Sequence, residues 1–197
     1  MALKTFVKIS KVNNLSDARY CAGMGVDMIG FSLDENDPDY VDAAKFTEIS
    51  EWLSGVEFVG EFQAPAGNDI AKKLSTHSIN YVELDTTEHI DELKRHGQRV
   101  ILRWPLANVN ALPFNLAVDY LLLESPHPPS AEELEDIKQR VSRVKVLLAS
   151  GIQDTNVEEL IKTTGAYGIA LTAGHEIKPG YKDFDELADI LEVLETE

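Results

Sequence analysis

Short apolar runs rich in Val, Ile and Leu alternate along the chain with longer stretches whose apolar residues recur every three or four positions. Runs of the first kind are typical of strands buried on both faces, and the second pattern is typical of amphipathic helices. The runs predict eight strands, near Thr5–Ser10, Met28–Ser32, Glu57–Phe62, Tyr81–Leu84, Arg99–Trp104, Tyr120–Glu124, Val144–Ala149 and Gly168–Leu171. The periodic stretches predict seven helices, near Leu15–Met24, Ala43–Leu53, Asn68–Thr76, Glu88–His96, Ala131–Val141, Asn156–Thr163 and Phe184–Leu194.

Local signals mark where two of these helices begin. Ser130 precedes two glutamates, and Asp154 or Thr155 precedes another acidic pair, so these residues are expected to cap helix N-termini. The segment Ala107–Leu116, after the fifth strand, contains Asn and Pro without a clean period. It is expected to be irregular, and no regular helix is predicted there.

Regular alternation of strands and helices implies parallel βαβ units. Eight such units of about 25 residues each predict a minimal (β/α)8 TIM barrel that occupies residues 1–197 as a single domain. The competing architecture is an open doubly wound sheet. No Gly-x-Gly-x-x-Gly follows the first strand, and eight regular units close more naturally than they fan out, so the barrel is favoured.

Composition restricts the partners. The 197 residues are 44% hydrophobic, which suits one sizeable core, and they carry a formal net charge of −16. Such a surface repels nucleic acids and anionic membranes, so neither is expected as a partner. The only cysteine is Cys21, so no disulfide within the chain is possible. With no signal-peptide core and no apolar run of transmembrane length, a cytoplasmic protein is expected.

The last two predicted strands both end in small residues followed by glycine. Adjacent parallel strands of this kind expose backbone N–H groups beside helix N-termini, where a phosphate can bind. The alternative interpretation is that glycine only permits a tight turn between strand and helix. In a barrel this is the usual phosphate position, so we predict a phosphorylated small molecule as ligand. The predicted phosphate-binding residues are Ser150, Gly151, Thr172, Ala173 and Gly174.

Several segments, in this order and spacing, resemble the phosphoribosylanthranilate isomerase family, a group of tryptophan-pathway barrels. The resemblance runs from about Phe6 to about Leu194 and is weakest in the middle of the chain. The segments that carry it are Phe6-Val-Lys-Ile-Ser10 with Asn13-Asn-Leu-Ser-Asp-Ala18, Gly25-Val-Asp-Met-Ile-Gly-Phe31, Ala149-Ser-Gly-Ile-Gln-Asp-Thr-Asn-Val157, Thr172-Ala-Gly174 and Lys178-Pro-Gly-Tyr-Lys-Asp183.

The resemblance implies an Amadori rearrangement, in which an N-linked phosphoribosyl aldose becomes a ketose. The family uses a cysteine general base at the end of strand one and an aspartate general acid at the end of strand six. Here Ser10 and Glu124 occupy those places. Because a serine hydroxyl is far less acidic than a thiol, a substitute base is needed, and Ser10 itself and Asp85 are the candidates.

Other positions also depart from the family pattern. An arginine in the second loop is replaced by Asp39, where the substrate's carboxylate would be expected. The end of strand four reads Glu83-Leu-Asp-Thr86 instead of Gln-Leu-His-Gly, and Ala170 replaces an aspartate on strand eight. The glycine-rich loop after strand six is replaced by Ser125-Pro-His-Pro-Pro-Ser130. The comparison therefore predicts a retained phosphate site beside an altered reaction centre.

Two cations are candidates for binding the rest of the ligand. Lys8 shares the inward face of its strand with Ser10, and a buried lysine needs a carboxylate partner such as Glu83 or Asp85. Arg103 is expected either to pair with Glu124 or to form an anion or ring platform with the tryptophan that follows it.

These observations leave two hypotheses open. The first is an isomerase of the aldose–ketose type with weak or altered activity. The second is a catalytically silent or repurposed barrel that binds a phosphorylated metabolite or a protein partner. Neither needs a cofactor, and the state expected is a monomer or homodimer. No metal site is predicted, because the histidines lie in five separate segments without metal-ligand spacing; they are His77, His89, His96, His127 and His175.

Overall fold

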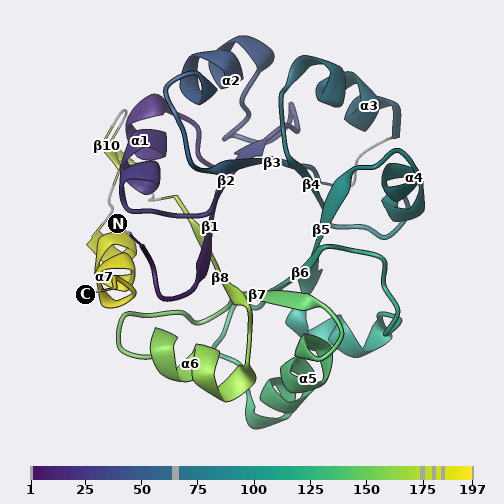
Figure 1. The fold of residues 1–197 in the computed structure, drawn as a ribbon, viewed down its shortest axis with the longest axis vertical. Coiled ribbons are helices and arrows are strands. Elements are labelled where there is room, and N and C mark those ends of the chain that lie inside the picture. Colours follow the sequence, from purple (N-terminus) through teal and green to yellow (C-terminus); the bar gives the residue numbers. More distant parts are fainter. Residues whose placement is uncertain (1, 64–66, 174–175, 179–180, 183–184, 197) are drawn as a thin grey trace.

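Eight parallel strands form a closed barrel in the order of the sequence (Figure 1). The computed structural model describes residues 2–63, 67–173, 176–178, 181–182 and 185–196. Closure comes from β1 and β8, which pair along their whole lengths from Phe6 opposite Gly168 to Ser10 opposite Thr172. The predicted barrel is therefore confirmed. Its strands are β1 (Phe6–Ser10), β2 (Met28–Ser32), β3 (Glu57–Glu61), β4 (Tyr81–Leu84), β5 (Arg99–Pro105), β6 (Tyr120–Glu124), β7 (Lys145–Ala149) and β8 (Gly168–Thr172).

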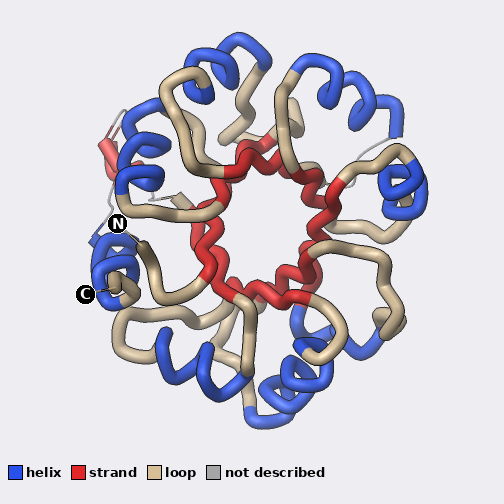
Figure 2. The backbone as a smooth tube through the Cα atoms, viewed as in Figure 1, coloured by secondary structure: helices blue, strands red, loops and turns tan. Residues whose placement is uncertain are grey.

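Helices surround the barrel on its outside (Figure 2). All seven predicted helices are confirmed to within a few residues, and they are α1 (Leu15–Gly23), α2 (Ala43–Ser50), α3 (Gly67–Thr76), α4 (Ile90–Arg95), α5 (Ala131–Val141), α6 (Val157–Thr164) and α7 (Asp185–Val193). Ser130 caps α5 as predicted, in a reciprocal capping box with Glu133. For α6 the predicted caps are wrong, because the N-cap is Asn156, whose side chain instead binds the preceding loop at Gly151 O and Gln153 N.

The segment between β5 and β6 forms a 3-10 helix, η1 (Leu106–Ala111), in place of a regular α-helix. This agrees with the irregular segment predicted there. Arg140 of α5 holds η1 and the turn after it, because its guanidinium donates hydrogen bonds to the carbonyl oxygens of Val109, Leu112 and Pro113 at 2.6, 2.8 and 3.1 Å. The sequence did not predict a short hairpin that follows β8. It is made of β9 (Glu176–Lys178) and β10 (Tyr181–Lys182).

The strands present two apolar faces, since side chains alternate along each strand. One set packs outward against the helices, and a smaller set fills the barrel. The interior set comprises Met28, Val59, Tyr81, Ile101, Tyr120, Leu122, Leu147 and Ala170. Near the strands' amino-terminal ends, the Tyr120 ring lies 5.3 Å from the Phe6 ring and 5.7 Å from the Tyr81 ring, measured between centroids. Aromatic packing therefore fills this end of the barrel.

The two ends of the chain meet beside the barrel. Lys4 N donates a hydrogen bond to Leu194 O at 2.7 Å, and Leu3 forms a bridge with Glu195. Cys21 is buried in the outer core and is not part of a disulfide. Among the described residues, no helix combines the length and the apolar character needed to cross a membrane.

Candidate functional site

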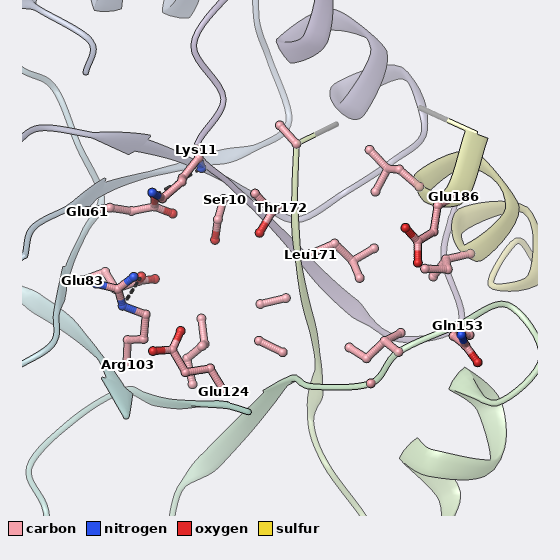
Figure 3. Close-up of a pocket in the computed structure, with 18 of the residues that line it drawn as sticks. Ser10, Lys11, Glu61, Glu83, Arg103, Glu124, Gln153, Leu171, Thr172 and Glu186 are labelled. Carbon is pink, nitrogen blue, oxygen red and sulfur yellow. Dashed lines mark hydrogen bonds and ion pairs between the residues drawn. The ribbon is translucent and has the colours of Figure 1, made fainter. Parts of the chain in front are cut away.

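A cavity of about 710 Å³ lies at the carboxyl-terminal ends of the strands (Figure 3). Seven of the eight strands or the loops after them contribute to its wall, and α7 contributes from outside the barrel. Its polar lining residues are Ser10, Lys11, Glu61, Glu83, Arg103, Glu124, Gln153, Thr172 and Glu186. Most of these sit at the ends of inward-facing rows, which is where TIM barrels place ligands.

Lys8 is the centre of a buried charge cluster under this cavity. Its side chain is completely buried, and its ammonium lies 2.6 Å from Ser10 Oγ, 2.5 Å from Glu61 Oε1 and 2.9 Å from Glu83 Oε2. Burial alone would lower the pKa of Lys8, but the two carboxylates hold it above its ordinary value. Lys8 is therefore a permanent cation, and it reaches the cavity only through Ser10 and the glutamates.

Gly30 of β2 makes room for this cluster. A Cβ atom at this position would overlap Glu61 Oε1 and would lie 3.1 Å from Lys8 Nζ. Glu61 also accepts a hydrogen bond from the backbone N–H of Lys11 at 3.2 Å, so both of its oxygens are engaged. The missing side chain on β2 thus allows a carboxylate from β3 to reach a lysine on β1.

Glu83 is the most deeply buried carboxylate of the cavity wall, with 2% of its side chain exposed. Burial raises the pKa of Glu83, although Lys8 opposes the shift. Its Oε2 is close enough to Lys8 for an ion pair but accepts no hydrogen bond of good geometry. Glu83 is therefore a desolvated carboxylate with spare accepting capacity.

Arg103 occupies the inward face of β5 among carboxylates. Its guanidinium lies 3.8 Å from Glu83 and 3.8 Å from Asp85. Burial opposes the charge, but Glu83 and then Glu124 raise the pKa of Arg103 above its ordinary value. The neighbouring Trp104 faces the outer core and donates a hydrogen bond to Asn108 O at 3.1 Å. The expected platform of Arg103 and Trp104 is wrong, because adjacent strand residues point to opposite faces.

Glu124 and Asp85 differ in their access to the cavity. Glu124 ends β6, is exposed and points into the cavity (Figure 3). Asp85 follows β4, lies 3.8 Å from the Arg103 guanidinium and is not among the residues that line the cavity. Of the two catalytic carboxyl groups predicted from the sequence, Glu124 is thus the one placed to meet a ligand.

The predicted phosphate-binding residues lie at the ends of β7 and β8. Gly151 adopts the left-handed conformation, with φ of 57°, and a Cβ atom there would come within 2.5 Å of Pro128 Cα. Glycine is required at this turn. Thr172 lines the cavity next to Ser10 (Figure 3).

Other members of the predicted phosphate set are differently placed. The N–H of Ala173 already donates to Ser10 O at 2.9 Å, although the residue lines the cavity. Ser150 is buried, and its hydroxyl contacts Leu123 O at 3.4 Å. Gly174 lies outside the described residues. Gly151 and Thr172 are therefore the residues of this set that best support the predicted site.

The second loop is tied down away from the cavity. Asp39 accepts a hydrogen bond from Asn13 Nδ2 at 2.7 Å and does not line the cavity. The neighbouring Asp37 is buried and pairs with Lys11 Nζ at 3.0 Å. Lys11 thus lines the cavity as a cation whose charge is already compensated. Within the described part of the chain, no group of three or more His, Cys, Asp or Glu residues is arranged to hold a metal ion.

Sequence reasoning missed Glu61 and Lys11 as residues of the site. Glu61 ends β3 on the same inward face as Val59, so the alternation of that strand could have indicated it. Lys11 is the first residue after β1 and has φ of 57°, a conformation that the sequence gives no reason to expect of a lysine.

Comparison with known proteins gives a consistent result. The family model described as N-(5'-phosphoribosyl)anthranilate (PRA) isomerase matches residues 7–193. The chain is 26% identical to the N-(5'-phosphoribosyl)anthranilate isomerase of Maridesulfovibrio salexigens, across 94% of this chain and 96% of that protein. It is 28% identical to the enzyme of the same name from Gloeothece citriformis, across 95% and 93% of the two chains.

Solved structures show the same fold. The phosphoribosyl anthranilate isomerase of Thermus thermophilus superposes with a TM-score of 0.78 at 22% identity, covering 96% of this chain and 98% of that one. A phosphoribosyl anthranilate isomerase in complex with reduced 1-(o-carboxyphenylamino)-1-deoxyribulose 5-phosphate superposes with a TM-score of 0.77 at 22% identity, with the same coverage. These likenesses establish the barrel architecture independently of the strand pairing.

Proposed function

The chain belongs to the N-(5'-phosphoribosyl)anthranilate isomerase family, and from this premise we propose that it isomerises a phosphoribosylated amine from the aldose to the ketose form. The observation that carries the proposal is that the predicted phosphate-binding residues and two carboxyl groups line one cavity. Gly151 follows β7 and Thr172 ends β8, where the sequence predicts a phosphate, and the carboxyl groups of Glu83 and Glu124, at the ends of β4 and β6, line the same cavity. A phosphoribosyl group placed between them brings its sugar carbons to the carboxyl groups.

Glu124 acts as the general acid in this proposal. Its carboxyl group protonates the ring oxygen of the sugar, the ring C–O bond breaks, and the nitrogen lone pair forms an iminium at C1. A base then removes the proton from C2, and the electrons of that C–H bond neutralise the iminium and leave an enolamine. Protonation of C1 and loss of the proton from the C2 hydroxyl give the ketose, so no atom is gained or lost. Positioned acids and bases each contribute about 10²- to 10⁴-fold to such steps.

We assign removal of the C2 proton to Glu83. Ser10 is a poor base here, because its oxygen accepts a hydrogen bond from an ammonium that stays charged. Ser10 is better suited to donate its own proton to a ligand hydroxyl. Asp85, the other substitute predicted from the sequence, is beside the cavity rather than in it. Glu83 lines the cavity, and although its Oε2 lies 2.9 Å from the same Lys8 ammonium, burial holds its pKa above that of an ordinary carboxylate, which makes it a stronger base.

The alternative is a barrel that binds a phosphorylated metabolite without turnover. The contact between Lys8 and Ser10 favours it, since the position of the family's base holds a hydroxyl locked onto a cation. Both alternatives keep phosphate recognition at the ends of β7 and β8. They differ in whether Glu83 and Glu124 act on the bound sugar.

The test is conversion of phosphoribosylated aromatic amines by the purified protein. Proton NMR monitors the reaction through the hydrogens on the sugar carbons. N-(5-phosphoribosyl)aniline and N-(5-phosphoribosyl)anthranilate serve as substrates. We expect the ketose of at least one to form faster with the wild type than with Glu83→Gln. If both compounds bind, as measured by calorimetry, but neither is converted, the binding alternative is correct. If neither binds, the phosphate site itself is wrong.

The expected oligomeric state is a monomer or homodimer. One solved relative, with 23% identity and a TM-score of 0.77, is described as monomers generated from the dimeric enzyme of Thermotoga maritima. Size-exclusion chromatography with light scattering measures the molar mass and decides between the two states. A molar mass equal to that of a trimer or larger contradicts both.

A further inference from the structure

The cavity carries an excess of negative charge on the side where β3, β4 and β6 end. Glu61, Glu83 and Glu124 line this side, and Asp85 lies just outside it. Arg103 is the cation that lines the cavity beside these carboxyl groups. Lys8 does not line the cavity, because it is completely buried beneath them. Even with Lys8 counted, four carboxyl groups face two cations.

Arg103 lies among these carboxyl groups at ion-pair rather than hydrogen-bond distance, and its buried Nε has no hydrogen-bond partner among the described residues. Glu83, Glu124, Glu61 and Asp85 all act on its charge, with two of them at 3.8 Å from the guanidinium. An anionic ligand group placed here would have to compete with them for Arg103 and would face several carboxylates at once. Like charges brought together in a partly desolvated site repel each other strongly.

The remaining cation of the wall offers no substitute. Lys11 Nζ is 3.0 Å from the buried carboxylate of Asp37, and the backbone N–H of Lys11 is bonded to Glu61. The second loop supplies no cation either, since Asp39 holds the loop to Asn13. The described residues on this side therefore favour hydrogen-bond donors or a positive charge over a carboxylate.

We infer that the amine portion of the ligand carries no carboxylate, and that the preferred ligand is a phosphoribosyl derivative of a neutral or cationic amine. This inference rests on the proposed function, because it takes the phosphate to lie at Gly151 and Thr172. Phosphate binding draws the ligand into the site, and the carboxyl groups of Glu61, Glu83 and Glu124 then select the group at the opposite end. The same carboxyl groups accept hydrogen bonds from N–H donors on that group.

The test compares two stable product analogues that differ by one carboxylate. They are reduced 1-(phenylamino)-1-deoxyribulose 5-phosphate and its o-carboxyphenyl counterpart, and the readout is the Kd of each by calorimetry. We expect the wild type to bind the phenyl compound at least about tenfold more tightly. Equal affinity, or tighter binding of the carboxylated compound, overturns the inference and leaves the proposed function intact.

Two variants locate the source of the selectivity. Glu83→Gln removes a carboxylate beside Arg103, so it should bring the ratio of the two Kd values to within about threefold of one. Glu186→Gln is the matched control, because Glu186 lines the same cavity from α7, on the far side from Arg103 (Figure 3). It should leave the ratio unchanged, and an equal effect of both variants contradicts the role given to the charges around Arg103. If neither analogue binds the wild type and ribose 5-phosphate also fails to bind, the proposed function and this inference both fall.

Discussion

At the scale of single residues, the charge cluster under the cavity depends on a glycine, Gly30, whose lack of a side chain leaves room for a neighbour. Gly30 gives Glu61 the space to reach Lys8 across β2, and the pair is buried in a barrel that also holds an apolar interior cluster. Breaking a buried ion pair is costly because it leaves an uncompensated charge away from water.

We therefore predict that Gly30→Ala lowers the free energy of unfolding by about 3 kcal/mol. The new methyl group would displace Glu61 and leave Lys8 with a single carboxylate. Urea unfolding measures the change. Gly23→Ala is the control, since nothing lies within 4 Å of a Cβ atom there and alanine suits a helix better than glycine. A similar loss in both variants would show that the Glu61 contact is not the cause.

His77 provides a second prediction at this scale, for the pH dependence of stability. Burial lowers the pKa of His77 from its ordinary value of 6.5, and the ring packs against Phe46 at 5.2 Å between centroids. The unfolded chain thus takes up the proton before the folded chain does, so stability is full above pH 6.5 and declines as the pH falls below it.

The measurement is the urea midpoint at pH 7.5 and at pH 5.5, for the wild type and for His77→Gln. The wild type should lose more stability than the variant over this interval, because the variant has no group there to protonate. Equal losses would mean that other groups account for the pH dependence.

Strand alternation allowed part of this arrangement to be predicted. The inward direction of Lys8 and Ser10 follows from the period of two along β1. The sequence also offered Glu83 or Asp85 as the partner of Lys8, and the structure shows Glu83 in that place. The contact with Glu61 does not follow, since it depends on the register of three strands and on the empty space at Gly30. Positions within a strand can be read locally, whereas distances across the barrel cannot.

At the scale of elements, η1 shows how an irregular segment is held by its neighbour. Its sequence lacks a helical period, and Arg140 of α5 satisfies three of the carbonyl groups in and after it. The sequence predicted the irregularity of this segment but not its contact with Arg140. That contact could not be predicted locally, because Arg140 lies 31 residues after Val109 in the chain.

Arg140→Met should lower the free energy of unfolding by about 3 kcal/mol, because it leaves buried carbonyl groups without a donor. Chemical denaturation measures this loss. Arg143→Met is the matched control, since Arg143 is an exposed arginine just after α5. A loss of less than about 1 kcal/mol for Arg140→Met would mean that water or a neighbouring group replaces the guanidinium.

At the scale of the whole molecule, closure of the barrel brings residues from distant parts of the sequence to one cavity. β1 pairs with β8, so Ser10 lies opposite Thr172, and the helical shell leaves the carboxyl ends of the strands as the site for ligands. The barrel was predictable because eight regular units restrict the topology. The altered carboxyl groups were visible in the sequence, but which of them face the cavity depends on the closed barrel.

The central claim is that this cavity isomerises a phosphoribosylated amine with Glu124 as acid. The most direct test is kcat/KM for ketose formation from N-(5-phosphoribosyl)aniline by the wild type and by Glu124→Gln. Because Glu124 is exposed, the substitution should leave the fold intact, and circular dichroism checks this. We predict measurable turnover by the wild type and a decrease of about 10²- to 10⁴-fold in the variant. No turnover by the wild type, or equal rates for both proteins, would contradict the account.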